Sequence, residues 1–137
     1  MKIALRALTA AALVYAGAIH LHLATRYDGG GALSVGNQFR LQFAVSIVAA
    51  LVLLIPRRWA LLPAVVVAVA TLGAVLASVY LTVPAIGPIA ALPHEPWYME
   101  KSLSAIAEGA VVLLGASLMR ARTPPTGEAT ASGLNTK

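Results

Sequence analysis

The chain has 137 residues, of which 59% are hydrophobic and only 11% are charged, whereas a soluble domain typically carries about 25% charged residues. A chain this short buries only a modest core, so this much apolar surface needs lipid as its solvent. The absence of cysteine excludes disulfides, thiolate metal sites and thiol-based catalysis. No nucleic-acid-binding motif accompanies the net charge of +5, so we interpret the basic residues as topology signals and expect no nucleic-acid partner.

Four apolar segments are each close to the length of about 20 residues that a membrane-spanning helix requires. Pro63 falls in the first turns of the third segment, where a missing N–H is tolerated, and Pro96 suits the first helical position of the fourth. The sequence therefore predicts an all-α integral membrane protein, a four-helix transmembrane bundle within residues 1–120. We expect spans at residues 7–25, 38–56, 59–83 and 96–119.

The distribution of basic residues predicts the orientation of these spans. Only Arg26, Arg40 and Lys101 fall on one side of the four-span arrangement, and the other side holds seven: Lys2, Arg6, Arg57, Arg58, Arg120, Arg122 and Lys137. Because basic residues concentrate in cytoplasmic loops, both termini are predicted to be cytoplasmic, in a cell membrane. Residues 121–137 are poor in hydrophobic residues and rich in Thr, Pro, Gly and Ser, which predicts a disordered cytoplasmic tail.

The first 18 residues also resemble a signal peptide, with Lys2 and Arg6 before an apolar stretch and small residues at 16–18. The apolar character continues past that site through Leu23. We therefore favour an uncleaved first span.

Ionisable side chains are few within the spans, and such groups usually face the bundle interior. Glu108 lies roughly 10 Å below the outer boundary near Lys101, where we expect its carboxyl to be protonated or paired because desolvation disfavours the charge. His20 lies roughly 7 Å below the same boundary, so the two side chains are expected to face each other across a helix contact. Small residues at four-residue steps let helix backbones approach closely: Ala12 and Ala16 in the first span, Ala105 and Gly109 in the fourth.

His22 cannot share the face of His20, because two residues along a helix differ by about 200°. We expect His22 at the headgroup region, and we expect neither a metal site nor haem, because haem held by two histidines needs them on different helices. The remaining aromatic residues at the span ends are interpreted as membrane anchors: Tyr27, Trp59, Trp97 and Tyr98. A stripe of hydroxyl residues in the third span favours helix packing over ligand binding: Thr71, Ser78 and Thr82.

These placements predict a polar pocket that opens toward the outer leaflet. Its candidate ligand-binding residues are His20, Arg40, Gln42, Tyr80 and Glu108. The alternative is that His20 and Glu108 form only a structural hydrogen bond between two helices.

The arrangement resembles small bacterial membrane proteins of the DoxX-like kind. The resemblance lies in four short spans, a histidine near the end of the first, "GNQFRLQF" opening the second, and an acidic residue in the last. It covers about residues 7–120, as architecture. DoxX-like relatives include subunits linked to quinone-dependent oxidation, so the resemblance implies a lipophilic redox partner, without carrying over any catalytic residue.

The function expected from the sequence is that of an accessory or small-molecule-binding membrane protein, with a quinone-like molecule as one candidate ligand. One alternative is a redox-enzyme subunit in which His20 and Glu108 exchange protons with a bound quinone. Another is an oligomeric transporter, although no polar stripe runs the full depth of the membrane. The expected partners are the lipid bilayer, a lipophilic small molecule, and a second copy or another membrane protein.

Overall fold

The computed structural model describes residues 2–29 and 33–120 and consists of four long helices. Two short 3-10 turns, η1 (Thr25–Tyr27) and η2 (Arg58–Ala60), follow the first helix and precede the third. The prediction of an all-α four-helix bundle is confirmed, and the predicted tail at 121–137 lies outside the described residues. The helices are α1 (Lys2–Ala24), α2 (Val35–Leu53), α3 (Leu61–Tyr80) and α4 (Met99–Arg120).

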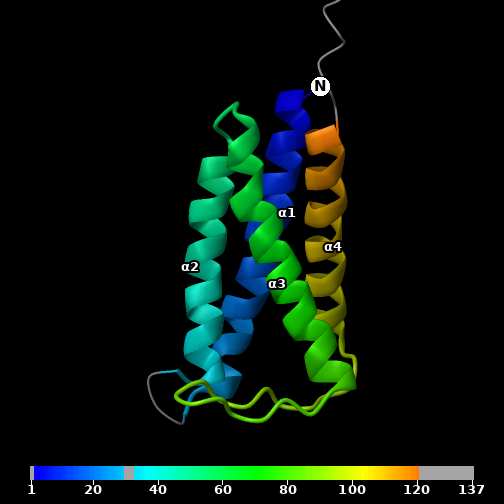
Figure 1. Cartoon of the computed structure of the whole chain (residues 1–137). Helices are drawn as coiled ribbons and strands as arrows, with labels where there is room; N and C mark the ends of the chain where they lie inside the picture. Colours follow the sequence, from blue (N-terminus) through cyan, green and yellow to red (C-terminus); the bar gives the residue numbers. More distant parts are fainter. Residues whose placement is uncertain (1, 30–32, 121–137) are drawn as a thin grey trace, which may run out of the picture.

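The helices run side by side, so that the bundle has two distinct ends (Figure 1). One end, here called the termini end, holds the start of α1, the end of α4 and the turn between α2 and α3. The opposite end, the loop end, holds the end of α1, the start of α2 and the long segment 81–98. Helix α1 packs against both α2 and α4, and α3 packs mainly against α4, so the contact between α2 and α3 is the smallest between neighbouring helices.

All four helices are long and apolar enough to cross a membrane. Large side chains on their outer faces remain exposed, for example Leu51 at 62%, Val66 at 62% and Leu113 at 70%. A helix that is apolar on its exposed face as well as its buried face is typical of a lipid environment.

Several helix boundaries differ from those expected, among them the start of α1 at Lys2 and the end of α3 at Tyr80, and two of the differences have a clear cause in the structure. Helix α2 begins at Val35, earlier than predicted, because the Ser34 hydroxyl caps it by accepting a bond from the Asn37 backbone N–H at 3.3 Å. Helix α4 begins at Met99, so Pro96 lies in the preceding segment rather than in the first turn of the helix. The backbone N–H of Glu95 donates to the Ser78 carbonyl at 3.0 Å, which ties this segment to α3 before α4 can start.

The apolar core fills the half of the bundle nearest the termini end. Its small residues allow close helix approach, and Gly115 shows how close, since a Cβ atom there would lie 2.5 Å from Cγ2 of Val65. The expected small-residue contact at Ala105 and Gly109 is wrong: both are only partly buried, and a Cβ atom at Gly109 would meet nothing within 4 Å. The buried cluster consists of Ala10, Leu13, Ala49, Ala50, Leu53, Leu61, Ala64, Ala68 and Val111.

Segment 81–98 crosses the loop end and covers the interior of the bundle there (Figure 1). Ile86 and Ile89 exchange two backbone hydrogen bonds of 3.1 Å around a turn, and Gly87 supplies the positive φ of 58° that the turn requires. The Leu92 N–H donates to the Val83 carbonyl at 3.2 Å. These bonds fold the segment back on itself, so that its second half reaches α3 and the start of α4.

Candidate functional site

His20 and Glu108 face each other inside the bundle, as expected from the sequence. Nδ1 of His20 lies 4.0 Å from Oε1 of Glu108, and the two side chains are 6% and 0% exposed. Nδ1 also lies 2.9 Å from the Ala16 carbonyl oxygen. Because a carbonyl only accepts, Nδ1 carries the hydrogen of this bond, and Nε2 of the neutral ring keeps the lone pair.

The Glu108 carboxyl is only partly satisfied by its neighbours. The Ser104 hydroxyl, one turn earlier on α4, donates to Oε1 at 3.1 Å. Oε2 is buried and has no hydrogen-bond partner among the described residues, although the polar side chains of Gln42 on α2 and Thr71 on α3 act on the same carboxyl. An unsatisfied buried polar atom costs about 1–3 kcal/mol, so a ligand donor or ordered water would be stabilised here.

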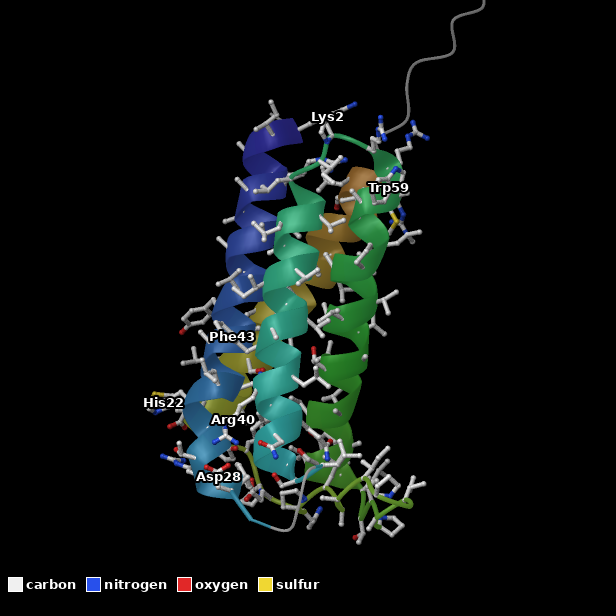
Figure 2. The ribbon with its side chains drawn as sticks, turned by 90° about the vertical axis from the view of Figure 1, so that its left-hand side faces the viewer. Lys2, His22, Asp28, Arg40, Phe43 and Trp59 are labelled. Carbon is white, nitrogen blue, oxygen red and sulfur yellow. The ribbon has the colours of Figure 1, made fainter. Side chains whose placement is uncertain are left out.

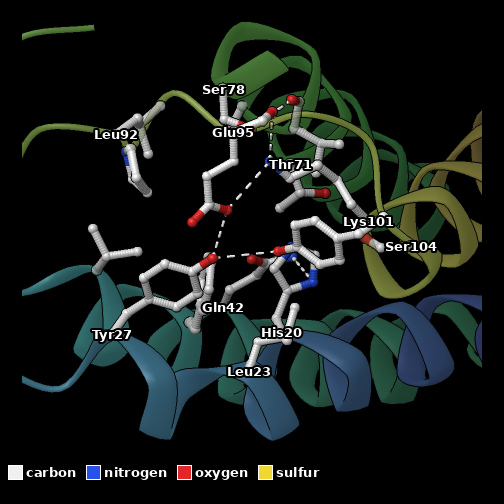
Figure 3. Close-up of a pocket in the computed structure, with 16 residues that line it drawn as sticks. His20, Leu23, Tyr27, Gln42, Thr71, Ser78, Leu92, Glu95, Lys101 and Ser104 are labelled. Atoms are coloured by element: carbon white, nitrogen blue, oxygen red, sulfur yellow. Dashed lines mark hydrogen bonds and ion pairs between the residues drawn. The ribbon is translucent and has the colours of Figure 1, made fainter.

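A small cavity of about 60 Å³ lies between these residues and segment 81–98 (Figure 3). Glu108 stands behind the wall of the cavity, next to His20 and Ser104, which line it. The Phe39 ring, in an edge-on contact 5.0 Å from the His20 ring, belongs to the apolar part of the wall. The polar part comes from all four helices, η1 and segment 81–98: His20, Tyr27, Gln42, Thr71, Ser78, Glu95, Tyr98, Lys101 and Ser104.

A second polar cluster closes the cavity toward the loop end (Figure 3). The Tyr27 hydroxyl donates to Oε2 of Glu95 at 2.6 Å and lies 3.3 Å from the Tyr98 hydroxyl. Nζ of Lys101 lies 3.5 Å from the same Glu95 oxygen and 5.0 Å from the centre of the Tyr98 ring. Burial, with added repulsion from nearby carboxylates, raises the pKa of the Tyr98 phenol, so this hydroxyl stays neutral at physiological pH. The cluster joins η1, α4 and segment 81–98.

The structure does not bring two of the five predicted site residues to the cavity. The Arg40 guanidinium is exposed and donates to both oxygens of Asp28, at 2.6 and 2.7 Å, so that it links α2 to the connection after η1 on the outside of the bundle (Figure 2). Tyr80 is 67% exposed, and its hydroxyl accepts a bond from the Trp97 indole N–H at 3.1 Å. His20 and Gln42 line the cavity, and Glu108 lies directly behind it.

Sequence reasoning missed the cluster around Glu95. Lys101 is the clearest case: the sequence uses it as a topology signal, whereas the structure buries it to 6% exposure. Tyr27 and Tyr98, expected as membrane anchors, direct their hydroxyls toward Glu95 and toward each other. A lysine in the first turn of an apolar helix, with a glutamate shortly before it, is the signal that could have indicated this contact.

The stripe of hydroxyl residues on α3 is divided between two environments. Thr71 and Ser78 line the cavity, and their hydroxyl hydrogens are donated to carbonyls of their own helix, at 2.9 Å to Val67 and 2.7 Å to Val75. Thr82 lies beyond α3 and is exposed. The oxygens of Thr71 and Ser78 therefore face the cavity as acceptors.

Comparison with models of known protein families, with curated proteins and with solved structures finds no match to this chain. The resemblance to DoxX-like proteins therefore stays a prediction from the sequence, and the site is judged on its own geometry.

Proposed function

We propose that this protein is an integral membrane protein that binds a small polar molecule, or the polar head of a lipophilic one, in the cavity at the loop end. The observation that supports this function is the wall of the cavity, where nine polar or charged side chains gather in a bundle whose other half is apolar. Polar groups within membrane spans are costly, and in membrane proteins they commonly mark a functional site.

The roles within the cavity follow from the hydrogen bonds already made. Nε2 of His20 offers a lone pair, and Thr71 offers an acceptor oxygen. Glu108 acts as a positioning residue, because it holds the Ser104 hydroxyl and lies beside the His20 ring. A ligand that donates hydrogen bonds suits this set of acceptors best.

The volume of the cavity limits the size of the ligand. About 60 Å³ corresponds to about two water molecules at about 30 Å³ each, whereas an apolar cavity of about 150 Å³ holds benzene. A group of a few heavy atoms therefore fits, and a quinone ring requires Phe39 or segment 81–98 to move. The small contact between α2 and α3 offers a lipophilic tail a route toward the bilayer.

The apolar half of the bundle favours binding over transport. Between the cavity and the termini end the interior is filled by side chains such as Leu13, Leu53 and Leu61, each no more than 1% exposed. A transport pathway needs polar groups or water along the full depth of the membrane. We therefore propose that a ligand enters from the loop end when the cluster around Glu95 opens, and the charge distribution predicts that this end faces away from the cytoplasm.

The test uses the full chain purified in mild detergent. Native mass spectrometry measures any retained non-lipid mass, and fluorescence melting measures stabilisation by two added probes, methylammonium and hydroquinone. We expect a retained mass or stabilisation by methylammonium, because a ligand present at 100 times its Kd stabilises by about 2.7 kcal/mol. Stabilisation by hydroquinone alone would instead favour a quinone-like ligand and a cavity that opens.

Paired variants separate the cavity from the rest of the bundle. Thr71→Val keeps the side-chain shape and His20→Ala removes the imidazole, and both should abolish the retained mass or the probe response. His22→Ala, an exposed residue on the same helix, should leave the response unchanged. A wild-type protein without a retained mass and without a probe response would contradict the proposed function.

A further inference from the structure

The carboxyl of Glu108 is buried without a strong partner for a negative charge. Its side chain is 0% exposed, and its Oε2 has no hydrogen-bond partner among the described residues. His20 is the basic group that approaches it, with Nδ1 at 4.0 Å from Oε1, but the hydrogen on Nδ1 is donated to the Ala16 carbonyl. Buried charges in proteins are paired or coordinate metal ions, so an ionised Glu108 calls for a cation.

Hydroxyl oxygens on α3 and α4 lie beside this carboxyl. Oγ of Ser104 is 3.1 Å from Oε1 of Glu108, and Thr71 on α3 acts on the same carboxyl. The Thr71 hydroxyl donates its hydrogen to the Val67 carbonyl, so its oxygen is an acceptor. Serine in a helix can also donate to a carbonyl one turn earlier, which would free the Ser104 oxygen. Two carboxyl and two hydroxyl oxygens then form one set of acceptors.

The spacing of these oxygens suits a hard metal cation, which prefers oxygen ligands. Calcium, whose radius is close to that of sodium, holds its oxygen ligands at about 2.3–2.6 Å, so two ligands about 80–90° apart around the ion lie about 3.0–3.7 Å from each other. The distance of 3.1 Å between Oγ of Ser104 and Oε1 of Glu108 falls within this range. Both side chains are buried, at 1% and 0% exposure, so bulk water does not compete freely for the ion.

The charge around the carboxyl sets the valence of the cation. The described residues contain no group of three or more His, Cys, Asp or Glu side chains that could hold a metal ion, whereas divalent cations are commonly held by several carboxylates. A monovalent cation on Glu108 leaves the site neutral, and net charge within a membrane is costly. Lys101 also lines the cavity, but Glu95 balances its charge at 3.5 Å. The side chains of α2 and α3 that act on the carboxyl, Gln42 and Thr71, carry no charge.

We propose that the cavity binds a small monovalent metal cation, Na⁺, held by the Glu108 carboxylate and the hydroxyl oxygens of Thr71 and Ser104. Figure 3 shows Thr71 and Ser104 at the cavity together with His20. The volume of about 60 Å³ leaves room for a water molecule, at about 30 Å³, to complete the shell of the ion. The cation takes the acceptors of the cavity described above, so this proposal rests on the proposed function and names its ligand. It departs from the expected absence of a metal site, because hydroxyl groups supply half of the oxygens.

The test labels the full chain in mild detergent with dicyclohexylcarbodiimide, which reacts with a protonated carboxyl in an apolar site. Mass spectrometry of peptides measures the rate of labelling at Glu108 in NaCl and in choline chloride at equal ionic strength. We expect Na⁺ to protect Glu108, with labelling about 100-fold slower at 100 times the Kd, and choline to have no effect. Fluorescence melting in the same two salts is the second measurement, and Na⁺ should raise the melting temperature.

Variants of the hydroxyl ligands locate the ion. Thr71→Val and Ser104→Ala should each raise the Na⁺ concentration that gives half protection by about 10-fold, because each removes one oxygen from a charged group. Labelling at the wild-type rate without Na⁺ would show that Glu108 is still in place in these variants. Ser117→Ala is the matched control on α4, since this exposed hydroxyl donates to the Leu113 carbonyl at 2.8 Å, and it should leave protection by Na⁺ unchanged.

Equal labelling and equal melting temperatures in the two salts would overturn the proposal. If methylammonium still stabilises the protein in that case, the proposed function stands and the cavity takes an organic hydrogen-bond donor; if neither cation acts and no ligand is retained, both proposals fail. Protection by Na⁺ that is unchanged in Thr71→Val and Ser104→Ala would also overturn this proposal, because the ion would then bind elsewhere.

Discussion

The two ends of the bundle use charged residues in different ways. At the loop end each of the three cations has a carboxylate: Arg26 lies 3.7 Å from Glu100, Arg40 lies 2.6 Å from Asp28, and Lys101 lies 3.5 Å from Glu95. At the termini end Arg6 is held by three backbone carbonyls instead. The loop end is therefore held by ion pairs between side chains, and the termini end by hydrogen bonds from one guanidinium to the backbone.

This difference shows that a count of charges does not reveal what each charged side chain does. The excess of basic residues at one end is the basis for predicting that it is cytoplasmic. Lys101 belongs to the smaller group at the other end and yet has the deepest burial of any cation in the described residues. Variants at each end therefore measure how firmly that end is held together.

The largest effect is expected where α1 and α2 approach most closely at the loop end. A Cβ atom on Gly36 would lie 2.5 Å from the Ala24 carbonyl oxygen and 2.7 Å from Oδ1 of Asp28. Because the first of these is a backbone atom, Gly36→Ala should push the helices apart and lower the free energy of unfolding by about 3 kcal/mol, at the upper end of overpacking costs. Thermal or denaturant unfolding in detergent measures this loss.

Gly109→Ala is the matched control for that variant. A Cβ atom on Gly109 would meet nothing within 4 Å, so alanine there should stabilise α4 by up to about 1 kcal/mol through its higher helix propensity. Equal losses in the two variants would show that the close approach at Gly36 is not the cause of the destabilisation.

A second effect tests the buried pair of Lys101 and Glu95. The Lys101 side chain is 7% exposed and that of Glu95 is 31% exposed. Glu95→Gln leaves a buried ammonium without its carboxylate, whereas Lys101→Met leaves a carboxylate that still reaches water and Tyr27. Removing one partner of a fully buried pair costs about 3–5 kcal/mol, so with this partial exposure we expect a loss of about 2 kcal/mol for Glu95→Gln and about 1 kcal/mol for Lys101→Met.

Unfolding of both single variants and of the double variant yields the coupling between the two residues. Equal losses would mean that Lys101 is hydrated. If the two losses are simply additive, Lys101 and Glu95 do not interact and do not close the cavity as a pair.

A third effect tests the termini end through Arg6. Arg6→Gln removes the guanidinium that binds three backbone carbonyls around the turn between α2 and α3. Bonds from charged donors contribute about 1.5–3 kcal/mol when buried, but two of these three are exposed, so we expect a total loss of about 1.5 kcal/mol. Arg120→Gln, at the same end, should change stability by much less. A variant of Arg6 as stable as the wild type would show that water replaces the guanidinium.

The sequence predicted the number and type of helices because span length and charge distribution are local properties. It also placed His20 and Glu108 at a common depth, since the rise per residue of a helix is fixed. The sequence could not predict that Pro96 precedes α4 instead of lying in its first turn. The backbone N–H of Glu95 donates to the Ser78 carbonyl of α3, and the helix begins only at Met99. That bond depends on the path of segment 81–98, which no local pattern determines.

Arg40 and Tyr80 show that the residues lining the cavity are harder to predict than the depth of a residue along the bundle. Both lie at the expected end of the bundle, but the rotation of each helix leaves their side chains exposed, Arg40 at 40% and Tyr80 at 67%. The Arg40 guanidinium donates to Asp28 in the connection between α1 and α2. The Tyr80 hydroxyl accepts a bond from Trp97 in segment 81–98. Contacts between elements therefore decided which polar residues line the cavity.

The smallest effect concerns the exposed pair of Asp28 and Arg40. The hydrogen bonds from the Arg40 guanidinium lower the pKa of the Asp28 carboxyl below its ordinary value. Because the pKa in the folded state is lower than in the unfolded state, the pair stabilises the fold above about pH 4, the unfolded value, and this contribution is lost as the pH falls through the folded pKa. Asp28→Asn should therefore lower the melting temperature slightly at pH 7 and not at all at low pH. The difference in melting temperature at pH 7 should shrink in about 1 M salt, where charges are screened within about 3 Å. A difference that stays constant with pH would assign the effect to the shape of the connection between α1 and α2 rather than to charge, and charge pairing at the loop end would then be confined to Arg26 with Glu100 and Lys101 with Glu95.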